Sequence, residues 1–192
     1  MKIRILLFLI FFGFNNIYSQ DGYGLIQDAK KLIIKNKLNK ALYYLDEAKK
    51  GNYGFCGNAW DEAFWAINYN KAIIYQKKKE YDKSLIELDS IGGCSFGGDC
   101  EKSDSLKVAV LINKYGKEKI SKLFLEETSF IRNNTTTYFH GLHTINFISI
   151  NYIFIFSYVE DKKNKSSNEE QNKLEIRFNE LIKRYNFYKL LM

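Results

Sequence analysis

The clearest pattern in the chain is a pair of amphipathic stretches between residues 68 and 91. In the first stretch Ala72 and Tyr75 share one helical face, and in the second Leu85 and Leu88 do the same. The polar run 77–80 lies between them and predicts a turn. Two helices joined in this way pack antiparallel, but a single hairpin cannot bury its apolar stripe alone. The pattern therefore predicts neighbouring hairpins.

A related pattern occurs 43 residues earlier in the chain. A shift of that length aligns positions of similar size, in the pairs Ala29/Ala72, Leu32/Tyr75, Leu38/Tyr81, Ala41/Ser84 and Leu45/Leu88. Small residues at the contact let two helices approach closely. A weaker third copy, displaced by 36 residues, places apolar residues at corresponding positions, namely Val108, Leu111, Ile120 and Phe124.

The stretches 38–42, Leu-Asn-Lys-Ala-Leu, and 81–85, Tyr-Asp-Lys-Ser-Leu, are the best-matching parts of this pattern. The pattern resembles the tetratricopeptide repeat, in degenerate form, over about residues 23–125. That family usually repeats every 34 residues, so the longer period implies an insertion of about nine residues, most simply at 51–57. The resemblance implies an all-α fold of tandem antiparallel hairpins, a short solenoid, over residues 20–127. An ordinary helical bundle with coincidental spacing is the alternative.

The last third, residues 128–192, departs from the repeat and is expected to form a helical cap. Its most apolar part, residues 142–159, is interrupted by Asn146, Ser149, Asn151 and Ser157. Periodicity alone does not decide such a run. The tandem-hairpin context favours a buried helix, while the polar residues at 149 and 151 leave strand content open. A charged linker over 161–172 leads into a final amphipathic helix over about 169–190.

The N-terminus has the pattern of a secretory signal peptide. Lys2 and Arg4 precede a run of about ten apolar residues, and Ile17 and Ser19 occupy the positions that a signal peptidase reads. Cleavage after Ser19 would remove residues 1–19 and lower the net charge from +7 to +5. The mature protein is therefore predicted to be exported by a bacterium, either to the periplasm or outside the cell. An uncleaved N-terminal anchor is the alternative.

Composition narrows the function classes. The 192 residues contain no proline, which permits long helices. The basic residues are spread over helix faces and turns, so we expect only weak attraction to an anionic membrane or polysaccharide at the cell envelope. No motif that reads RNA or DNA occurs, and no catalytic triad order or dinucleotide fingerprint does. We expect no nucleic-acid partner, no enzyme activity and no cofactor.

The three cysteines are Cys56, Cys94 and Cys100. In an exported protein a disulfide is the default, and Cys94 and Cys100 enclose a short glycine-rich loop that can close without strain. We predict this pair, with Cys56 left as a thiol packed beside Phe55. Pairing of Cys56 with either of the others is the competing interpretation. A metal site built from Cys94, Cys100, His140 and His143 has loose spacing, and no metal is expected.

Both tryptophans of the chain lie within residues 51–67, which join the first two expected hairpins. Trp60, Phe64 and Ile67 recur at helical spacing. One interpretation is an aromatic patch that holds a peptide or a sugar. The favoured interpretation is that Trp60 and Phe64 fill the gap that the insertion opens between hairpins.

The predicted function is protein–protein interaction. In the repeat family the concave face is formed by positions of the first helices, and the resemblance carries these positions to Lys30, Tyr69, Ile73, Gln76 and Lys77. These residues are the expected contacts for a protein or peptide partner. The alternative function is a structural component of the envelope that acts by self-association through the apolar segment 142–159.

Overall fold

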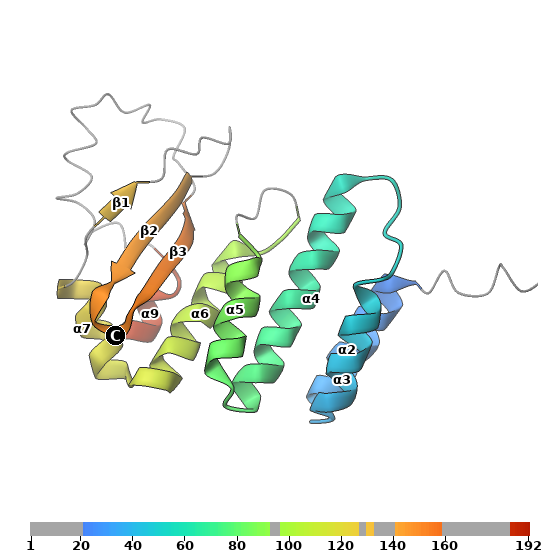
Figure 1. Ribbon diagram of the computed structural model, residues 1–192, viewed down its shortest axis with the longest axis horizontal. Helices are drawn as coiled ribbons and strands as arrows, with labels where there is room; N and C mark the ends of the chain where they lie inside the picture. The colour runs from blue at the N-terminus through green and yellow to red at the C-terminus, as the bar shows by residue number, and fades with distance from the viewer. Residues whose placement is uncertain (1–20, 93–96, 127–129, 133–140, 159–184) are drawn as a thin grey trace, which may run out of the picture.

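The computed structural model describes residues 21–92, 97–126, 130–132, 141–158 and 185–192 (Figure 1). The protein is mostly helical and carries a small antiparallel sheet towards its C-terminal end. Its described helices are α2 (Gly22–Ile34), α3 (Leu38–Ala48), α4 (Gly57–Lys77), α5 (Tyr81–Ser90), α6 (Cys100–Tyr115), α7 (Lys117–Glu126) and α9 (Tyr188–Leu191). Its described strands are β1 (Phe130–Arg132), β2 (Gly141–Phe147) and β3 (Tyr152–Tyr158).

Consecutive helices pack in pairs, α2 with α3, α4 with α5 and α6 with α7. The turn of each pair contains one residue with positive φ: Asn36 at 56°, Lys79 at 62° and Gly116 at 91°. In the first two turns a backbone N–H reaches back five residues, from Lys37 to the carbonyl of Leu32 and from Glu80 to that of Tyr75, both at 2.9 Å. These bonds satisfy carbonyls that the helix end leaves unpaired.

The buried side chains form two clusters, and α4 contributes to both. The first cluster joins α2, α3 and α4 and is built from alanine, isoleucine and leucine, together with Tyr53. The second cluster joins α5, α6 and α7 to the sheet and α9. Its largest fully buried side chains include five phenylalanines, Phe124, Phe147, Phe154, Phe156 and Phe187. The second cluster therefore joins the helical region to the C-terminal region.

The expectation of a buried helix over residues 142–159 is wrong, because this segment forms β2 and β3. The strands pair antiparallel with Ile145 opposite Phe154, and the sheet order is β1-β2-β3. Phe154 and Phe156 are buried, whereas Ile153 between the strand start and Phe154 is 54% exposed. Side chains of a strand alternate between its faces, so this spacing places both rings on the core side. The fold is thus mostly helical but not all-α.

The two strands are joined by a 3-10 turn, Ile148–Ile150, followed by Asn151 at φ 49°. Asparagine tolerates this left-handed conformation better than most residues, and it ends the turn where β3 begins. The polar interruptions at Ser149 and Asn151 therefore mark a connection between strands.

Several expectations fall outside the described residues. These are the signal peptide over 1–19, the linker over 161–172 and most of the final helix over 169–190. At the chain end the structure describes residues 185–192, where Phe187 and Leu191 are buried in the second cluster and α9 is short. Among the described helices, none has the length and apolar character needed to span a membrane.

Candidate functional site

A pocket of about 400 Å³ lies where α4, the first turns of α6 and the C-terminal residues meet. We call it the Tyr69 pocket, and its lining residues are Tyr69, Asp99, Glu101, Lys102, Ser105, Leu106 and Asn186. The α4 helix supplies one wall, and α6 supplies most of the others.

The position of α6 depends on the glycine-rich loop before it. Asp99 caps the helix, since its carboxylate accepts a hydrogen bond from the backbone N–H of Lys102 at 3.0 Å. A side chain at Gly98 would place its Cβ atom 2.7 Å from Cδ1 of Trp65, which is closer than two non-bonded carbon atoms can approach. Glycine at this position therefore lets the loop pack against Trp65.

Tyr69 forms an aromatic wall of the pocket. Its ring stacks on Trp65 with centroids 4.9 Å apart and planes 13° apart. The indole of Trp65 is held in turn, because its Nε1 donates to Oγ of Ser103 at 2.9 Å. Burial raises the pKa of the Tyr69 phenol, while the charge of Lys102 acts in the opposite direction and Asp99 adds to the increase. The ring is thus fixed in place and its hydroxyl is neutral at physiological pH.

The charged residues at the pocket differ in how they are paired. Lys102 and Asp99 form an ion pair at 2.7 Å, and the hydrogen bond from Lys102 lowers the pKa of Asp99. Glu101 is exposed, and no cation in the described part of the chain lies within ion-pair distance of it. Leu106 adds an apolar surface. The pocket therefore combines an aromatic ring, an apolar side chain and a carboxylate available to a ligand.

Of the five predicted partner-binding residues, Tyr69 is the one that lines this pocket. Ile73 packs against the first hydrophobic cluster, and Lys30 and Gln76 are half-buried elsewhere. Lys77 is exposed at the C-terminal end of α4. The structure does not bring these four residues to the pocket.

The remaining lining residues were missed from the sequence. The glycine-rich sequence of residues 92–103 predicts a loop that joins the second and third hairpins, whereas α6 begins at Cys100. The available signal was Asp99, a good N-cap residue followed by a charged first turn. Reading the helix from that cap would have placed Glu101 and Lys102 next to each other on its first turn.

The expectation that Trp60 and Phe64 fill a gap between hairpins is wrong. Their side chains are 43% and 44% exposed, respectively. Tyr53 is the residue that is buried there, with its hydroxyl bonded to the carbonyl of Ala48 at 2.7 Å. The Trp60 ring packs edge-on against Tyr53 with centroids 5.0 Å apart. The insertion therefore buries a tyrosine and leaves the two larger apolar residues at the surface.

Cys56 is a free cysteine, as expected, but it is exposed and does not pack beside Phe55, which is fully exposed as well. Cys94 lies outside the described residues. The Cys94–Cys100 disulfide stays a prediction.

Comparisons with known protein families, with curated proteins and with solved structures return no match for this chain. The residues and their geometry are therefore the basis for assigning a function. Among the side chains that the structure describes, no group of three or more histidine, cysteine, aspartate or glutamate residues is arranged to hold a metal ion.

Proposed function

We propose that this protein is a binding protein that holds a segment of another protein in the Tyr69 pocket. The observation that carries the proposal is the combination of a fixed aromatic ring, Leu106 and the exposed carboxylate of Glu101 around one pocket. Ligand sites in proteins are typically concave, a few hundred cubic ångströms in volume, and combine apolar surface with polar groups that orient the ligand.

The proposal includes a tandem arrangement of helical hairpins, supported by recurring contacts. Lys71 of α4 forms an ion pair with Asp46 of α3 at 2.9 Å, and Lys107 of α6 forms one with Asp89 of α5 at 3.3 Å. Asp46 and Asp89 are 43 residues apart, and Lys71 and Lys107 are 36 apart, the same two shifts that align the apolar positions. Each hairpin is thus linked to the next by a buried lysine in the same register.

The turns repeat with the same period. Asn36 and Lys79, also 43 residues apart, both take the left-handed conformation after a helix that ends in the same hydrogen-bond pattern. Ala41 and Ser84 occupy equivalent buried positions, and Oγ of Ser84 donates to the carbonyl of Ala72 at 2.8 Å. These correspondences support a short helical-repeat array of the tetratricopeptide type.

The chemistry of the pocket indicates the kind of segment it would hold. An apolar side chain would contact Tyr69 and Leu106, and a neighbouring lysine or arginine would pair with Glu101. The proposed ligand is therefore an extended peptide with an apolar residue beside a basic one. Lys30, Ile73, Gln76 and Lys77 remain secondary positions of the proposal, for a longer partner. Export to the periplasm or the medium is part of the same proposal.

A displayed library of random peptides, selected on the purified protein, tests this function. We expect the selected peptides to share an apolar–basic pair. Tyr69→Ala should weaken their binding at least tenfold, and Glu101→Gln should remove the preference for the basic residue. Matched controls are Tyr43→Ala and Asp61→Asn, an exposed tyrosine and an exposed acid away from the pocket. Equal losses in the controls, or no shared pair among the peptides, would contradict the assignment.

The second candidate is a structural component that self-associates through residues 142–159. Phe154 and Phe156 are used in the core of the chain itself, but Ile148 and Ile153 of the same segment are 74% and 54% exposed. Exposed isoleucines are the observation that favours this function. Sedimentation of the protein tests it: an oligomer that dissociates in the Ile148→Lys, Ile153→Lys variant supports self-association, and a monomer at all concentrations excludes it.

A further inference from the structure

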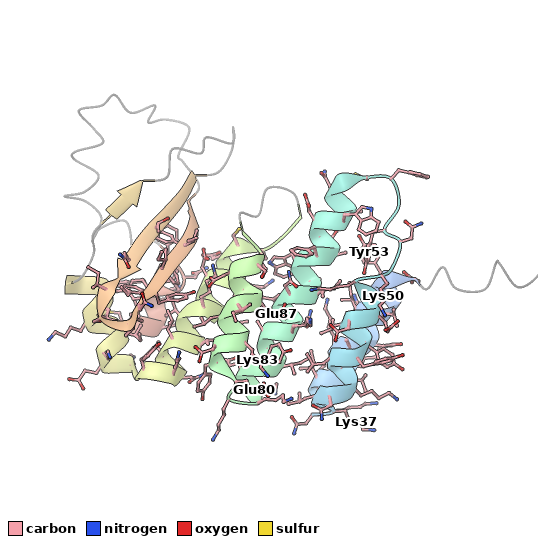
Figure 2. All side chains as sticks on the ribbon, viewed as in Figure 1. Lys37, Lys50, Tyr53, Glu80, Lys83 and Glu87 are labelled. Carbon is pink, nitrogen blue, oxygen red and sulfur yellow. The ribbon has the colours of Figure 1, made fainter. Side chains whose placement is uncertain are left out.

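The three turns between paired helices lie along one edge of the molecule. In Figure 1 the α2–α3, α4–α5 and α6–α7 turns are all at the lower end of the helices. Figure 2 shows Lys37 of the first turn and Glu80 and Lys83 of the second at this edge, with Lys50 and Tyr53 towards the opposite end. We call residues 35–40, 77–83 and 114–119 together the basic edge.

This edge holds a charge equal to the net charge of the whole chain. Its residues include ten lysines and three acids, a net charge of +7, and the formal net charge of the chain is also +7. The described segments at the opposite end, 47–62 and 97–102, contain three lysines and five acids. Across the described helices the molecule is therefore polarised, with its positive end at the turns.

Within the described part of the chain, half of the lysines at the edge have neither a carboxylate nor a ring beside them. Glu80 pairs with Lys78 and Lys83, and Asp82 pairs with Lys114. The exposed lysines without a carboxylate in ion-pair distance, among the residues that the structure describes, include Lys35, Lys37, Lys77, Lys79 and Lys117. At least one of them lies in each turn, so the charge extends along the full edge.

Tyrosine rings lie close to four of the other five lysines, and the fifth, Lys78, pairs with Glu80. The ammonium of Lys40 lies 5.7 Å from the ring centre of Tyr44, and that of Lys83 lies 5.6 Å from Tyr75. Lys114 and Lys119 lie 4.8 and 5.5 Å from the ring of Tyr115. Tyrosine and lysine together suit the headgroup region of a bilayer, because each has an apolar body and a polar end.

The same features argue against nucleic acid as the occupant. The basic edge contains no arginine, the residue that reads bases and phosphates through paired hydrogen bonds. The tyrosine rings beside the edge are half-buried, and lysine ammonium groups lie over them. They therefore do not offer open faces for stacking bases. Flexible point charges in a row suit a surface of diffuse negative charge.

We propose that the basic edge binds the surface of an anionic lipid bilayer. Bound in this way, the helices stand with their turns at the lipid headgroups. The Tyr69 pocket is at the first turns of α6, whereas the basic edge includes the last, and α6 with 16 residues is about 24 Å long. The pocket would then face the aqueous phase while the protein is held at the membrane. This inference does not depend on what the pocket binds.

Vesicle binding tests the proposal with the full chain. Residues 1–19 include an apolar run that would insert into any vesicle, so the readout is the difference in affinity between phosphatidylcholine vesicles with 30% phosphatidylglycerol and vesicles of phosphatidylcholine alone. Each lysine near an anionic bilayer is worth about a fivefold change in binding. The Lys77→Gln, Lys117→Gln variant should lose roughly 25-fold of its affinity for the anionic vesicles. The preference of the unaltered chain for anionic over neutral vesicles should weaken strongly at high salt.

The matched control is Lys49→Gln, Lys50→Gln, which removes the same charge at the opposite end and should lose less than about threefold, because charges beyond a Debye length of the surface are screened. A second edge variant, Lys35→Gln, Lys37→Gln, should behave as the first does. Equal binding to neutral and anionic vesicles, or equal losses in edge and control variants, would overturn the proposal. Tighter binding to a DNA duplex through the same lysines would assign the edge to nucleic acid and overturn it as well.

Discussion

The two hydrophobic clusters of this protein are built from different side chains. In the first, α2, α3 and α4 meet through alanines, and Ala29, Ala41, Ala48 and Ala63 are fully buried. In the second, the space between α6, α7, the sheet and the C-terminal residues is filled by phenylalanine rings. Phe124 packs edge-on against Phe147 and Phe154, with centroids 4.8 and 5.3 Å away.

The difference follows from the geometry of the two interfaces. Two helices with small residues at their contact can lie 8–10 Å apart, which leaves no room for rings. Packing a helical layer on a sheet leaves a thicker gap, and large rings fill it in edge-to-face pairs. Close helix–helix packing therefore requires small residues at regular helical spacing, and this pattern can be seen in the sequence. Packing of rings between a helical layer and a sheet requires no such regular pattern.

The largest expected effect comes from breaking the ring cluster. Phe154 is fully buried and lies within ring contact of Phe124, Phe147, Phe156 and Phe187. Phe154→Ala should lower the free energy of unfolding by about 3–5 kcal/mol, because it removes apolar contacts and leaves a cavity. Urea denaturation measures this value.

The matched control is Ile153→Ala on the same strand, where the side chain is 54% exposed. A change below about 1 kcal/mol is expected there. Comparable losses at the two positions would show that the face assignment of β3 is wrong. Leu45→Ala in the first cluster should shift the same single transition, since α4 belongs to both clusters.

A smaller effect tests the link between successive helix pairs. Lys71 is buried, and it pairs with Asp46 at 2.9 Å and Glu87 at 3.3 Å. Burial alone would lower the pKa of Lys71. The hydrogen bonds and negative charges of the two carboxylates outweigh this effect, so the pKa is raised overall and the lysine is charged in the folded protein. Lys71→Met leaves the poorly exposed Glu87 without its cation and should cost about 2 kcal/mol, less than a fully buried pair because Asp46 is half exposed.

Lys83→Met is the comparison for Lys71→Met. Lys83 also pairs with a carboxylate, that of Glu80, but at the exposed α4–α5 turn, and little change in stability is expected. Lys107→Met should resemble Lys71→Met, because Lys107 also donates to the carbonyl of Ile155 at 2.9 Å. If Lys71→Met were as mild as Lys83→Met, the buried lysines would not link the helix pairs.

The helical region could be predicted from its sequence because its contacts are local and periodic. The aligned positions Ala29/Ala72 and Ala41/Ser84 are all buried, and the turns at Asn36 and Lys79 lie where the polar runs are. These two signals are small residues at helical spacing and polar turn residues. Each lies within a short stretch of the chain, so it can be recognised without knowing the distant contacts.

The C-terminal region and the site could not be predicted in the same way. The choice between helix and strand for residues 142–159 depended on what the segment packs against, and that information is not in the segment itself. The Tyr69 pocket combines α4 with the start of α6 and Asn186, residues up to 117 positions apart. Tyr69 was predicted through the family resemblance, and the N-cap residue Asp99 was the one further signal, marking the start of α6.

The loop before α6 gives a third test, through its predicted disulfide. Closing a loop of seven residues between Cys94 and Cys100 stabilises the folded state by roughly 2 kcal/mol in the chain-entropy picture. Cys100→Ser should therefore lower stability by about that amount under oxidising conditions and have little effect in reductant. Cys56→Ser, at an exposed free thiol, is the control. A peptide linking Cys56 to either other cysteine, found by non-reducing mapping, would contradict the pairing.

The smallest predicted effect concerns the contact between the helices and the sheet. The hydroxyl of Tyr152 on β3 donates to Asp89 of α5 at 3.0 Å, and Asp89 also pairs with Lys107. Tyr152→Phe should cost about 1 kcal/mol near pH 8, since one hydrogen bond to a charged group is lost and the carboxylate keeps its lysine.

The effect of Tyr152→Phe should depend on pH in a defined direction. Burial raises the pKa of the Tyr152 phenol well above its usual range, and the negative charge of Asp89 adds to the increase. A tyrosine in the unfolded chain ionises near pH 10. The stabilisation from the protonated phenol is therefore complete below pH 10 and is lost as the pH rises, by up to about 1.4 kcal/mol per pH unit. Because phenylalanine cannot ionise, the stability difference between the unaltered chain and the variant should shrink from about 1 kcal/mol at pH 8 towards zero near pH 11.

Urea denaturation across this range measures it, with Tyr43→Phe as the control for removing an exposed hydroxyl. A difference that stays constant from pH 8 to pH 11 would show that Tyr152 is not buried against Asp89, and the contact between the helical region and the sheet would then be looser than the structure indicates.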